Sequence, residues 1–375
     1  MALNPLQQHK LLKGKIAISL KDDLGSKEKL STYYTPGVAE VSSYVAQHPD
    51  EAGDYTWLNN NVAVISDGTA VLGLGNIGPY GAMPVMEGKS MLFKHFAGID
   101  AVPIVLDVHT PDQIVDAVKA IAPSFGGINL EDIAAPQCFE IEERLKAELP
   151  IPVFHDDQHG TAVVVLAGLI NAMKVTGRKL EDAKIVVVGA GAAGTAIIKL
   201  LYEYAKPRIF AVDSKGLISA KRSDLNDAKR QLLSYSNQEA AQGTLSDVLV
   251  GADVFIGVSQ PGLLTADMIK TMAQKPIIFA LANPTPEIMP DQAKLAGVAV
   301  VATGRSDFAN QVNNALVFPG IFRGALDHKV RSITEKHKVA AAEVLASLVK
   351  TPTADLIIPP IDQPGIVEAI SKVIV

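Results

Sequence analysis

Two adjacent carboxylates, Asp156 and Asp157, have the type and spacing best suited to chemistry in this chain. They follow a short apolar run at residues 151–154 and precede a long helical pattern at residues 161–176. Neighbouring carboxylates repel each other, so the pair needs a cation, a hydrogen-bond network or a proton held by one of them. Two interpretations stay open: the pair belongs to a cation site, or it consists of solvated turn residues.

A second acidic pair, Glu131 and Asp132, opens a predicted helix at residues 131–147. Together the two pairs supply oxygen ligands, which Mg²⁺ or Mn²⁺ prefers, and such sites leave positions open for a chelating substrate. The alternative for this pair is ordinary capping of a helix start. His155 and His159 flank the first pair, and we interpret them as solvated or capping residues rather than metal ligands.

A glycine-rich turn follows an apolar run at residues 184–188 and opens a helical pattern at residues 192–204. In this setting the pattern Gly-x-Gly-x-x-Gly lets the backbone approach a pyrophosphate at a helix N-terminus, whereas the alternative is a tight turn without a ligand. Asp213 closes the next strand and can accept hydrogen bonds from ribose hydroxyls, which favours NAD over NADP. Ser214 and Lys215 follow it and can accommodate a phosphate. The predicted nucleotide-binding turn consists of Gly189, Gly191, Ala192, Ala193 and Gly194.

Two further residues are candidates for acid and base chemistry. Tyr34 lies in a constrained turn at residues 33–37, and a tyrosine acts as a general acid when nearby positive charge lowers its pKa. Lys89 follows a segment rich in Gly and Pro at residues 73–88, which we predict as a functional loop. Desolvation or a cation can lower the pKa of such a lysine. The alternatives are a packing tyrosine and a surface lysine, and Lys94 competes with Lys89.

Short apolar runs rich in β-branched residues alternate with helical patterns in the second half of the chain, which predicts a parallel sheet covered on both faces. Such a sheet gathers the carboxyl ends of its strands at one edge, where ligands bind. The amides of Asn283 and Asn314 suit a substrate carboxyl or hydroxyl group at or near this edge. The predicted strands cover residues 184–188, 208–212, 253–258, 277–281 and 298–302, and they run into Gly189, Asp213, Ser259, Asn283 and Gly304.

The first half of the chain is mixed, with predicted strands at residues 62–65 and 102–106 and a helix at residues 112–121. We predict a smaller N-terminal α/β domain for substrate and metal at residues 1–160 and a Rossmann-type, doubly wound nucleotide-binding domain at residues 161–350. The boundary lies in or just after the helical pattern at residues 161–176. A C-terminal tail at residues 351–375 is expected to pack back on the body.

Composition limits the class of protein. The 375 residues carry a net charge of −6 and contain no long basic block, which argues against nucleic-acid and membrane-surface partners. Cys138 is the single cysteine, as expected in a reducing compartment. The N-terminus lacks a signal-like apolar core, and the apolar stretches are broken by Gly, Asp or Lys. With a mean hydropathy of +0.22, we therefore expect a soluble cytoplasmic protein with a large buried core.

The ordered set of motifs resembles malic enzyme, the metal-dependent and NAD(P)-dependent oxidative decarboxylase of L-malate. The resemblance covers most of the chain, and the length is that of the short bacterial form. It runs from Tyr-Thr-Pro at residues 34–36 through Ser-Asp-Gly at 66–68, Leu-Gly-Leu-Gly-Asn-Ile-Gly at 72–78, the two acidic pairs and the glycine turn. It continues through Asn-Pro-Thr at residues 283–285 to Asn-Asn-Ala-Leu-Val-Phe-Pro-Gly at residues 313–320.

The resemblance implies a role for each candidate residue. The family's metal ligands fall on Glu131, Asp132 and Asp157, its general base on Lys89 and its general acid on Tyr34. Asp156 matches a carboxylate that assists proton transfer, and Asn283 and Asn314 match substrate-binding amides. The implied chemistry is oxidation of L-malate by NAD, or by NADP as the alternative, followed by loss of CO₂ with Mg²⁺ or Mn²⁺ and protonation to pyruvate.

One position departs from the family pattern, since Ala70 lies where longer members have an arginine that contacts a substrate carboxylate. An oxaloacetate decarboxylase on the same scaffold, without net redox chemistry, therefore stays the alternative activity, and a non-catalytic NAD-binding sensor is a third. The family also implies a homodimer. Whether a neighbouring protomer contributes to the site stays open, because Tyr34 is far in sequence from the metal candidates.

Overall fold

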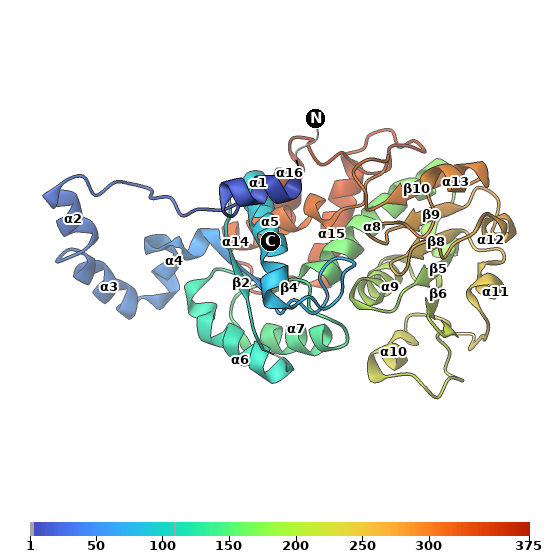
Figure 1. Ribbon diagram of the computed structural model, residues 1–375, viewed down its shortest axis with the longest axis horizontal. Coiled ribbons are helices and arrows are strands. Elements are labelled where there is room, and N and C mark those ends of the chain that lie inside the picture. The colour runs from blue at the N-terminus through green and yellow to red at the C-terminus, as the bar shows by residue number, and fades with distance from the viewer. Residues whose placement is uncertain (1–3, 109) are drawn as a thin grey trace.

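The computed structural model describes residues 4–108 and 110–375, so the first three residues of the predicted N-terminal domain and residue 109 lie outside it. Two sheets form the body (Figure 1). The first has the order β2-β1-β3-β4 with every pairing parallel, so β3 and β4 end side by side at one edge. Its strands are β1 (Asn61–Ser66), β2 (Asp100–Val105), β3 (Ile128–Leu130) and β4 (Val153–His155).

The second sheet has the order β10-β9-β8-β5-β6-β7 and is parallel except for β7. The chain adds β6 on one side of β5 and β8 to β10 on the other, which creates the switch point where such sheets bind ligands. The predicted doubly wound, Rossmann-type fold is confirmed. Its strands are β5 (Lys184–Val188), β6 (Arg208–Asp213), β7 (Gly216–Leu217), β8 (Val254–Gly257), β9 (Ile277–Ala280) and β10 (Val300–Thr303).

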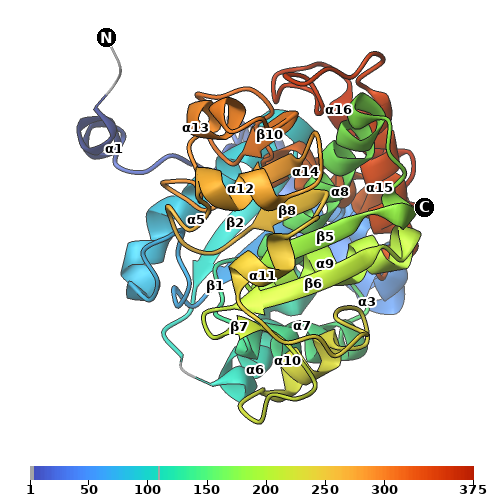
Figure 2. The same cartoon turned by 90° about the vertical axis from the view of Figure 1, so that its right-hand side faces the viewer.

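Helices cover both faces of the second sheet, as Figure 2 shows with α9 behind it and α11 and α12 in front. Alternate residues of the strands explain the two layers. Ile185 and Val187 pack with α9 and the main core, whereas Val186 and Val188 pack with α11 and α12. The helices of this domain are α9 (Ala192–Ala205), α10 (Asp227–Leu232), α11 (Leu245–Leu249), α12 (Ala266–Thr271) and α13 (Pro290–Leu295).

Helix α8 (Asp156–Thr176) connects the two sheets, and the main core around it includes residues from both. By length and composition alone α8 could cross a membrane, and it is the one such helix within the described ranges. This helix was not anticipated from the sequence, because the apolar stretches were expected to be broken well short of a membrane span. However, 67% of its apolar window is buried inside the fold, as is usual for a core helix. Asn171 ties it to the C-terminal segment by donating to the carbonyls of Ala346 (2.8 Å) and Ile357 (2.9 Å).

The C-terminal helices return to the first sheet. Phe318 and Phe322 pack against Phe93 with ring centroids 4.7 and 5.3 Å away, and α16 packs on α14 and α15. The domain bounds stay a prediction. The C-terminal helices are α14 (Phe318–Asp327), α15 (Glu335–Ser347) and α16 (Ile366–Ser371). The helices of the first domain are α5 (Gly78–Ala97), α6 (Pro111–Ile121) and α7 (Gln137–Glu148).

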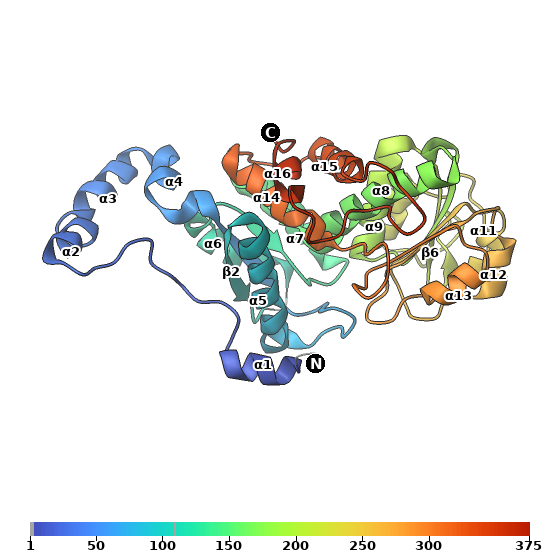
Figure 3. The ribbon, with the colours of Figure 1, turned by 90° about the horizontal axis from the view of Figure 1, so that it is seen from above.

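The N-terminal helices project from the body. In the perpendicular views of Figures 1 and 3, α2 and α3 lie at the far end of an extended segment, away from both sheets. None of residues 4–60 is buried. The N-terminal helices are α1 (Pro5–Leu12), α2 (Lys27–Tyr33), α3 (Val38–Gln47) and α4 (Ala52–Tyr55). Short 3₁₀ turns elsewhere in the described chain and beside α4 are η1 (Pro49–Glu51), η2 (Trp57–Asn60), η3 (Ala122–Ser124), η4 (Leu180–Asp182) and η5 (Asn314–Leu316).

Two element predictions are wrong. The predicted helix at residues 131–147 begins only at Gln137, because Pro136 disfavours helical backbone in the residue before it. The predicted loop at residues 73–88 is helical from Gly78 onward, because Pro79 at the first turn has a backbone angle suited to a helix start. Glu131 and Asp132 therefore do not cap a helix, and Lys89 lies in the middle of α5.

Candidate active site

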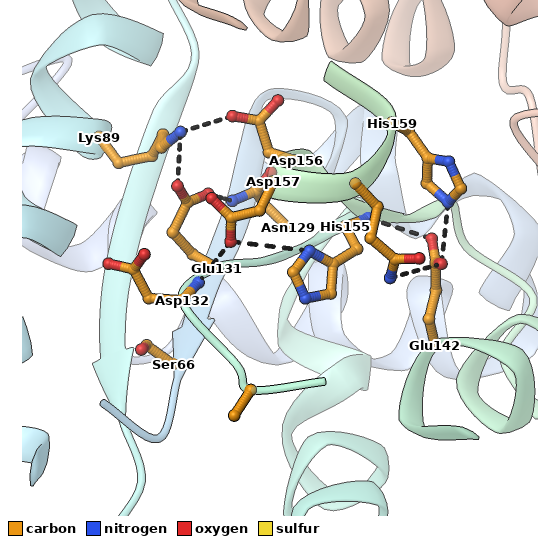
Figure 4. Close-up of polar contacts among 12 residues, drawn as sticks. Ser66, Lys89, Asn129, Glu131, Asp132, Glu142, His155, Asp156, Asp157 and His159 are labelled. Carbon is orange, nitrogen blue, oxygen red and sulfur yellow. Dashed lines mark hydrogen bonds and ion pairs between the residues drawn. The ribbon is translucent and has the colours of Figure 1, made fainter. Parts of the chain in front are cut away.

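Four carboxylates meet at the carboxyl edge of the first sheet (Figure 4). Glu131 and Asp132 directly follow β3, and Asp156 and Asp157 form the start of α8 directly after β4. Because β3 and β4 are parallel neighbours, the two pairs are brought together. One carboxylate oxygen from each of Glu131, Asp132 and Asp157 lies within 4.8 Å of the others.

The carboxyl groups of this three-carboxylate cluster all have raised pKa values. Burial raises the pKa of Asp132 to about 8, and the charges of Asp157 and Glu131 add to the rise. Burial also raises the pKa of Glu131 to about 7 and that of Asp157 to about 6. Asp132 Oδ2 is buried without a hydrogen-bond partner. Three hard oxygen donors, one of them unpaired, fit a divalent cation such as Mg²⁺ or Mn²⁺.

The backbone also holds this cluster in place. Asp132 has a φ of +54°, which is uncommon for a residue with a side chain. Its N–H donates to Asp157 Oδ2 at 2.7 Å, which joins the two strand ends. Asn129, on β3, donates to Glu131 Oε2 at 2.9 Å and fixes the rotamer of that carboxylate.

Lys89 reaches the cluster from α5. Its Nζ lies 2.6 Å from Asp156 Oδ2 and 2.7 Å from Glu131 Oε1, and its residue is 7% exposed. Phe318 covers it with the ring centroid 4.3 Å from Nζ. The surface-lysine alternative is therefore wrong for Lys89. It applies to Lys94, whose side chain is 61% exposed and paired with Asp100.

The proton on Lys89 is controlled by its neighbours. Burial lowers the pKa of Lys89, but the charges of Asp156, Glu131 and Asp157 outweigh burial and raise the pKa above its ordinary value. Burial raises the pKa of Asp156 to about 7, against the opposing charge of Lys89. We expected desolvation or a cation to lower the pKa of Lys89. The structure shows that the carboxylate charges must be neutralised for that to happen.

His155 is fully buried and the side chain of His159 is only 14% exposed, so the expectation that they are solvated or capping is wrong. His155 Nδ1 lies 3.8 Å from Asp157 Oδ2, neither ring nitrogen has a hydrogen-bond partner, and burial lowers its pKa to about 4. His159 lies 2.8 Å from Glu142 and 3.0 Å from Lys338. Burial lowers the pKa of His159 to about 4 as well, so burial favours the neutral form of both imidazoles.

Several side chains around the site were missed by the sequence argument. Glu142 lies on α7 and accepts from His155 N at 3.1 Å, and Lys338 comes from α15. Phe318 belongs to a motif that was noted only for its amides. Asn129 carried a signal that went unused, since it is a polar residue inside a short buried strand, two positions before Glu131.

The nucleotide-binding turn has the geometry that its glycines predict. A Cβ on Gly194 would lie 1.7 Å from the Gly189 carbonyl oxygen, so α9 packs closely on β5 only with glycine there. A Cβ on Gly191 would meet nothing within 4 Å, which leaves open space at the start of α9, where Ala192 and Ala193 lie. Ala192 packs against the core of the first sheet, so the turn faces the domain that contains the carboxylates.

The other predicted nucleotide residues lie at the same edge. Ser259, after β8, donates its N–H to Glu287 Oε1 at 2.9 Å, and Ala282 N donates to Glu287 Oε2 at 3.1 Å. Glu287 is fully buried and was missed by the sequence argument. It holds the ends of β8 and β9 together beneath the place where a nucleotide is expected.

Asp213 is not a free carboxylate. Arg222 Nη1 lies 2.8 Å from its Oδ1, Lys229 Nζ lies 2.6 Å from its Oδ2, and the N–H of Lys215 donates to it at 2.9 Å. Burial opposes these contacts, yet the pKa of Asp213 falls below its usual value. Asp213 alone would repel the 2′-phosphate of NADP, but the positive charges of Arg222 and Lys229 offset that repulsion.

The two predicted substrate amides lie beside different sheets, Asn314 near the first and Asn283 at the edge of the second. A Cβ on Gly160 would approach both Asp156 Oδ1 (1.9 Å) and Asn314 Cβ (3.1 Å), so Asn314 lies beside Asp156. A Cβ on Gly73 would lie 2.3 Å from the carbonyl oxygen of Asn283, so the loop after β1 touches the edge of the second sheet. The absence of side chains at these glycines allows the close approach.

Tyr34 is the predicted site residue that the structure does not bring to the others. It follows α2 on the projecting segment, and it is 66% exposed (Figure 1). Within residues 4–108 and 110–375, no hydrogen bond joins it to Lys89 or to a carboxylate of the cluster.

Ala70 lies beside the cluster, donating its N–H to the Asp132 carbonyl at 2.9 Å, but has no side chain that reaches a substrate.

Two family models match the chain. The malic enzyme N-terminal domain matches residues 13–113 and 109–146, and the malic enzyme NAD-binding domain matches residues 158–375. A bifunctional malic/malolactic enzyme of Bacillus subtilis is 54% identical over 98% of this chain and 91% of its own length. An NADP-dependent malic enzyme of Halomonas elongata is 47% identical over 94% and 84%. The crystal structure of an NAD-dependent malic enzyme from Thermotoga maritima superposes with a TM-score of 0.96 at 48% identity, covering 100% of this chain and 99% of that one.

Replacing Asp157 by Asn should weaken Mn²⁺ binding by about a hundredfold or more, because it removes one of three charged ligands while keeping the acceptor for Asp132 N–H. Mn²⁺ binding followed by electron paramagnetic resonance measures this, and NADH fluorescence checks that the nucleotide site is intact. Asp116→Asn, on the exposed face of α6, is the control of equal charge. Unchanged Mn²⁺ affinity in the Asp157 variant would remove Asp157 from the metal site.

Proposed function

The chain belongs to the malic enzyme family, and we propose that it catalyses the oxidative decarboxylation of L-malate to pyruvate and CO₂ with reduction of NAD or NADP. One observation carries the site assignment: a buried lysine contacts a carboxylate from each of two neighbouring strand ends, beside three clustered carboxylates and facing a dinucleotide turn. That set combines a base and a cation site at the edge of the first sheet with a site for a hydride acceptor at the edge of the second.

Glu131, Asp132 and Asp157 are the proposed ligands of Mg²⁺ or Mn²⁺. When bound, such a cation supplies Lewis-acid stabilisation of negative charge on the substrate's C2 oxygen. The bound nicotinamide nucleotide supplies the acceptor for the C2 hydride. Both groups fit the residues present, since Asp132 Oδ2 is buried without a hydrogen-bond partner and the space at Gly191 is open.

Lys89 is the proposed general base, which takes the proton of the C2 hydroxyl. Its proton affinity is raised by Asp156, Glu131 and Asp157, so neutralising the last two removes part of the charge that keeps the lysine protonated. Asp156 remains within 2.6 Å and can exchange a proton with Lys89. Phe318 and α14 exclude water from this pair, which strengthens the interactions within it.

Asn283 and Asn314 are the proposed contacts of the substrate carboxylates. They come from the second sheet's edge and from the turn before α14, and each approaches the N-terminal domain at a glycine. Their amide groups donate hydrogen bonds in place of the arginine that longer family members have at the position of Ala70.

A cytoplasmic location and the lack of nucleic-acid or membrane partners stay predictions from the sequence.

A second candidate activity is decarboxylation without net redox chemistry. The absence of a cationic side chain at Ala70 favours it, because carboxylate binding then depends more on the metal ligands and amides. The Bacillus subtilis relative is named as both a malic and a malolactic enzyme. Oxaloacetate is the substrate that separates a lyase from an oxidoreductase, since its decarboxylation needs no nucleotide turnover.

Both nucleotides are proposed to bind, with only a modest preference for NAD. Asp213 would disfavour a 2′-phosphate if it were alone, but Arg222 and Lys229 offset its charge. Lys215 is available from the next residues and pairs with Asp224 at 2.9 Å. The cations Arg222, Lys229 and Lys215 can therefore pair with the 2′-phosphate of NADP in place of the carboxylates that they contact here.

The direct test of the activity is absorbance at 340 nm with Mn²⁺, L-malate and either nucleotide, with CO₂ release measured in parallel. Nucleotide reduction matched by CO₂ is the expected result. CO₂ from oxaloacetate without nucleotide, and no reduction with malate, would instead establish the lyase. Absence of both activities would contradict the proposed function.

Lys89→Ala should lower the rate of malate oxidation by about 10²–10⁴-fold, the usual contribution of a general base. Mn²⁺ and NADH binding should persist, because neither the metal ligands nor the nucleotide turn is altered. Lys94→Ala, one helical turn later and at the surface, should retain wild-type activity. Near-normal oxidation in the Lys89 variant would assign the base to another residue.

Arg222→Ala should raise KM for NADP by about tenfold or more and leave KM for NAD equal or lower, because it removes a cation and frees the Asp213 carboxylate for ribose hydroxyls. Arg208→Ala is the matched control, since Arg208 starts the same strand and pairs with Glu239 at the opposite end. Steady-state kinetics with both nucleotides measure the ratio. Equal changes in the two KM values would refute the assignment.

A further inference from the structure

Glu142 is a buried carboxylate that the reaction described above does not use. It lies on α7, and its residue is 5% exposed. Its Oε1 lies 3.1 Å from His155 N and 2.6 Å from Lys146 Nζ. Its Oε2 lies 2.8 Å from His159 Nε2 and 3.3 Å from Gln158 Nε2. A buried carboxylate is costly unless its oxygens are paired, and here each oxygen has two donors.

The donors lie on both sides of the acidic pair at residues 156–157. His155 comes immediately before the pair, and Gln158 and His159 come immediately after it. Helix α7 packs along β4, which brings Glu142 to this point (Figure 4). Because contacts on both sides of the pair hold the first turn of α8, they fix the direction in which the two aspartate side chains leave the helix.

The start of α8 has no cap of its own. The first N–H groups of a helix have no partner within it, and in a capping box the third helical residue accepts from the N-cap N–H. The N-cap of α8, His155, makes no side-chain cap hydrogen bond, and the third residue, Gln158, donates to Glu142. Glu142 also accepts from His155 N. A carboxylate from a neighbouring helix therefore replaces the local cap.

The contact between Glu142 and His159 is directed by Lys338, a residue of α15 that is 2% exposed. Lys338 Nζ lies 3.0 Å from His159 Nδ1. A lysine ammonium can only donate, so Nδ1 accepts, and the hydrogen of the neutral ring is on Nε2, which faces Glu142. Helices α7 and α15 thereby hold the imidazole from two sides.

The site depends on the position of this turn. Asp156 Oδ2 lies 2.6 Å from Lys89 Nζ, and Asp157 Oδ2 accepts from Asp132 N at 2.7 Å. Asp156 Oδ1 is buried without a hydrogen-bond partner, so the orientation of this carboxylate depends on its backbone and on Lys89. Groups in such a site must be held to within about 0.5 Å of their working positions.

We propose that Glu142 is a positioning residue, which fixes the first turn of α8 so that Asp157 reaches the cation and Asp156 reaches Lys89. This inference rests on the proposed function. Within residues 4–108 and 110–375, Glu142 has no hydrogen bond or ion pair with the general base or with a metal candidate. It acts through the residues on either side of the acidic pair.

Glu142→Gln tests this role with little change of shape. The amide keeps one acceptor oxygen, but its NH₂ group faces donors of α8, so one side of the turn is released. Mn²⁺ affinity, followed by electron paramagnetic resonance, should fall by about 10–100-fold, and kcat for malate oxidation should fall by a similar factor. KM for NAD should not change, because the nucleotide turn follows a strand of the other sheet.

Glu140→Gln is the matched control. Glu140 lies on the same helix, its side chain is 57% exposed, and it pairs with Arg144. The control removes the same charge and should bind Mn²⁺ like the wild type. Thermal unfolding of both variants sets the temperature at which the assays use folded protein. A folded Glu142 variant with wild-type Mn²⁺ affinity would overturn the inference, even with a lower melting temperature, because a purely structural role predicts that result.

Gln158→Met decides the case in which the Glu142 variant does not fold. It removes one donor and keeps the charge of Glu142, so Mn²⁺ affinity should fall by about two- to fivefold, as expected for one lost hydrogen bond. Unchanged affinity would then overturn the inference. Mn²⁺ binding does not need turnover. A wild-type protein that binds Mn²⁺ without oxidising malate would therefore contradict the proposed function alone, whereas one that does not bind Mn²⁺ would contradict both.

Discussion

The ion pairs of Lys89 with Asp156 and Glu131 are the interactions on which the site depends. Each carboxylate follows one of two parallel neighbouring strands, and the lysine approaches from a helix on the other side. Burial alone would favour the neutral form of each group. The carboxylate charges raise the pKa of Lys89 above its ordinary value and so keep the lysine protonated, whereas burial still raises the pKa of Asp156 and that of Glu131 to about 7. We therefore propose that metal binding and the base strength of Lys89 are linked through Glu131 and Asp157.

The sequence predicted most of this arrangement because it depends on local pattern and parallel topology. Apolar runs identified the strands of the second sheet, whereas β3 and its parallel pairing with β4, which bring the two acidic pairs together, were not predicted. The glycine turn was predictable for the same reason, since Gly194 has a steric role that no other residue can fill. Lys89 was assigned by resemblance, and its burial explains why Lys94 is a poorer candidate.

The remaining features depend on contacts that no local pattern records. Arg222, on an irregular segment, and Lys229, on α10, reach Asp213 from 9 and 16 residues away, so the charge at the ribose edge was misjudged. Glu142, Lys338 and Phe318 come from helices that pack only in the folded chain. The helix predicted at Glu131 failed because Pro136 follows it closely. Tyr34 follows α2 on the projecting segment, so it does not contact the residues with which the family pattern groups it.

The most direct measurement of the central claim is the pKa of Lys89 by NMR, using ¹³Cε-labelled lysine with Lys89→Arg to assign the signal. The titration is run without a metal and with saturating Mg²⁺. The account predicts that Mg²⁺ lowers the pKa of Lys89, because it neutralises Glu131 and Asp157 while leaving Asp156 in place. A pKa of Lys89 that is unchanged by Mg²⁺ would contradict the link between the carboxylate cluster and the base.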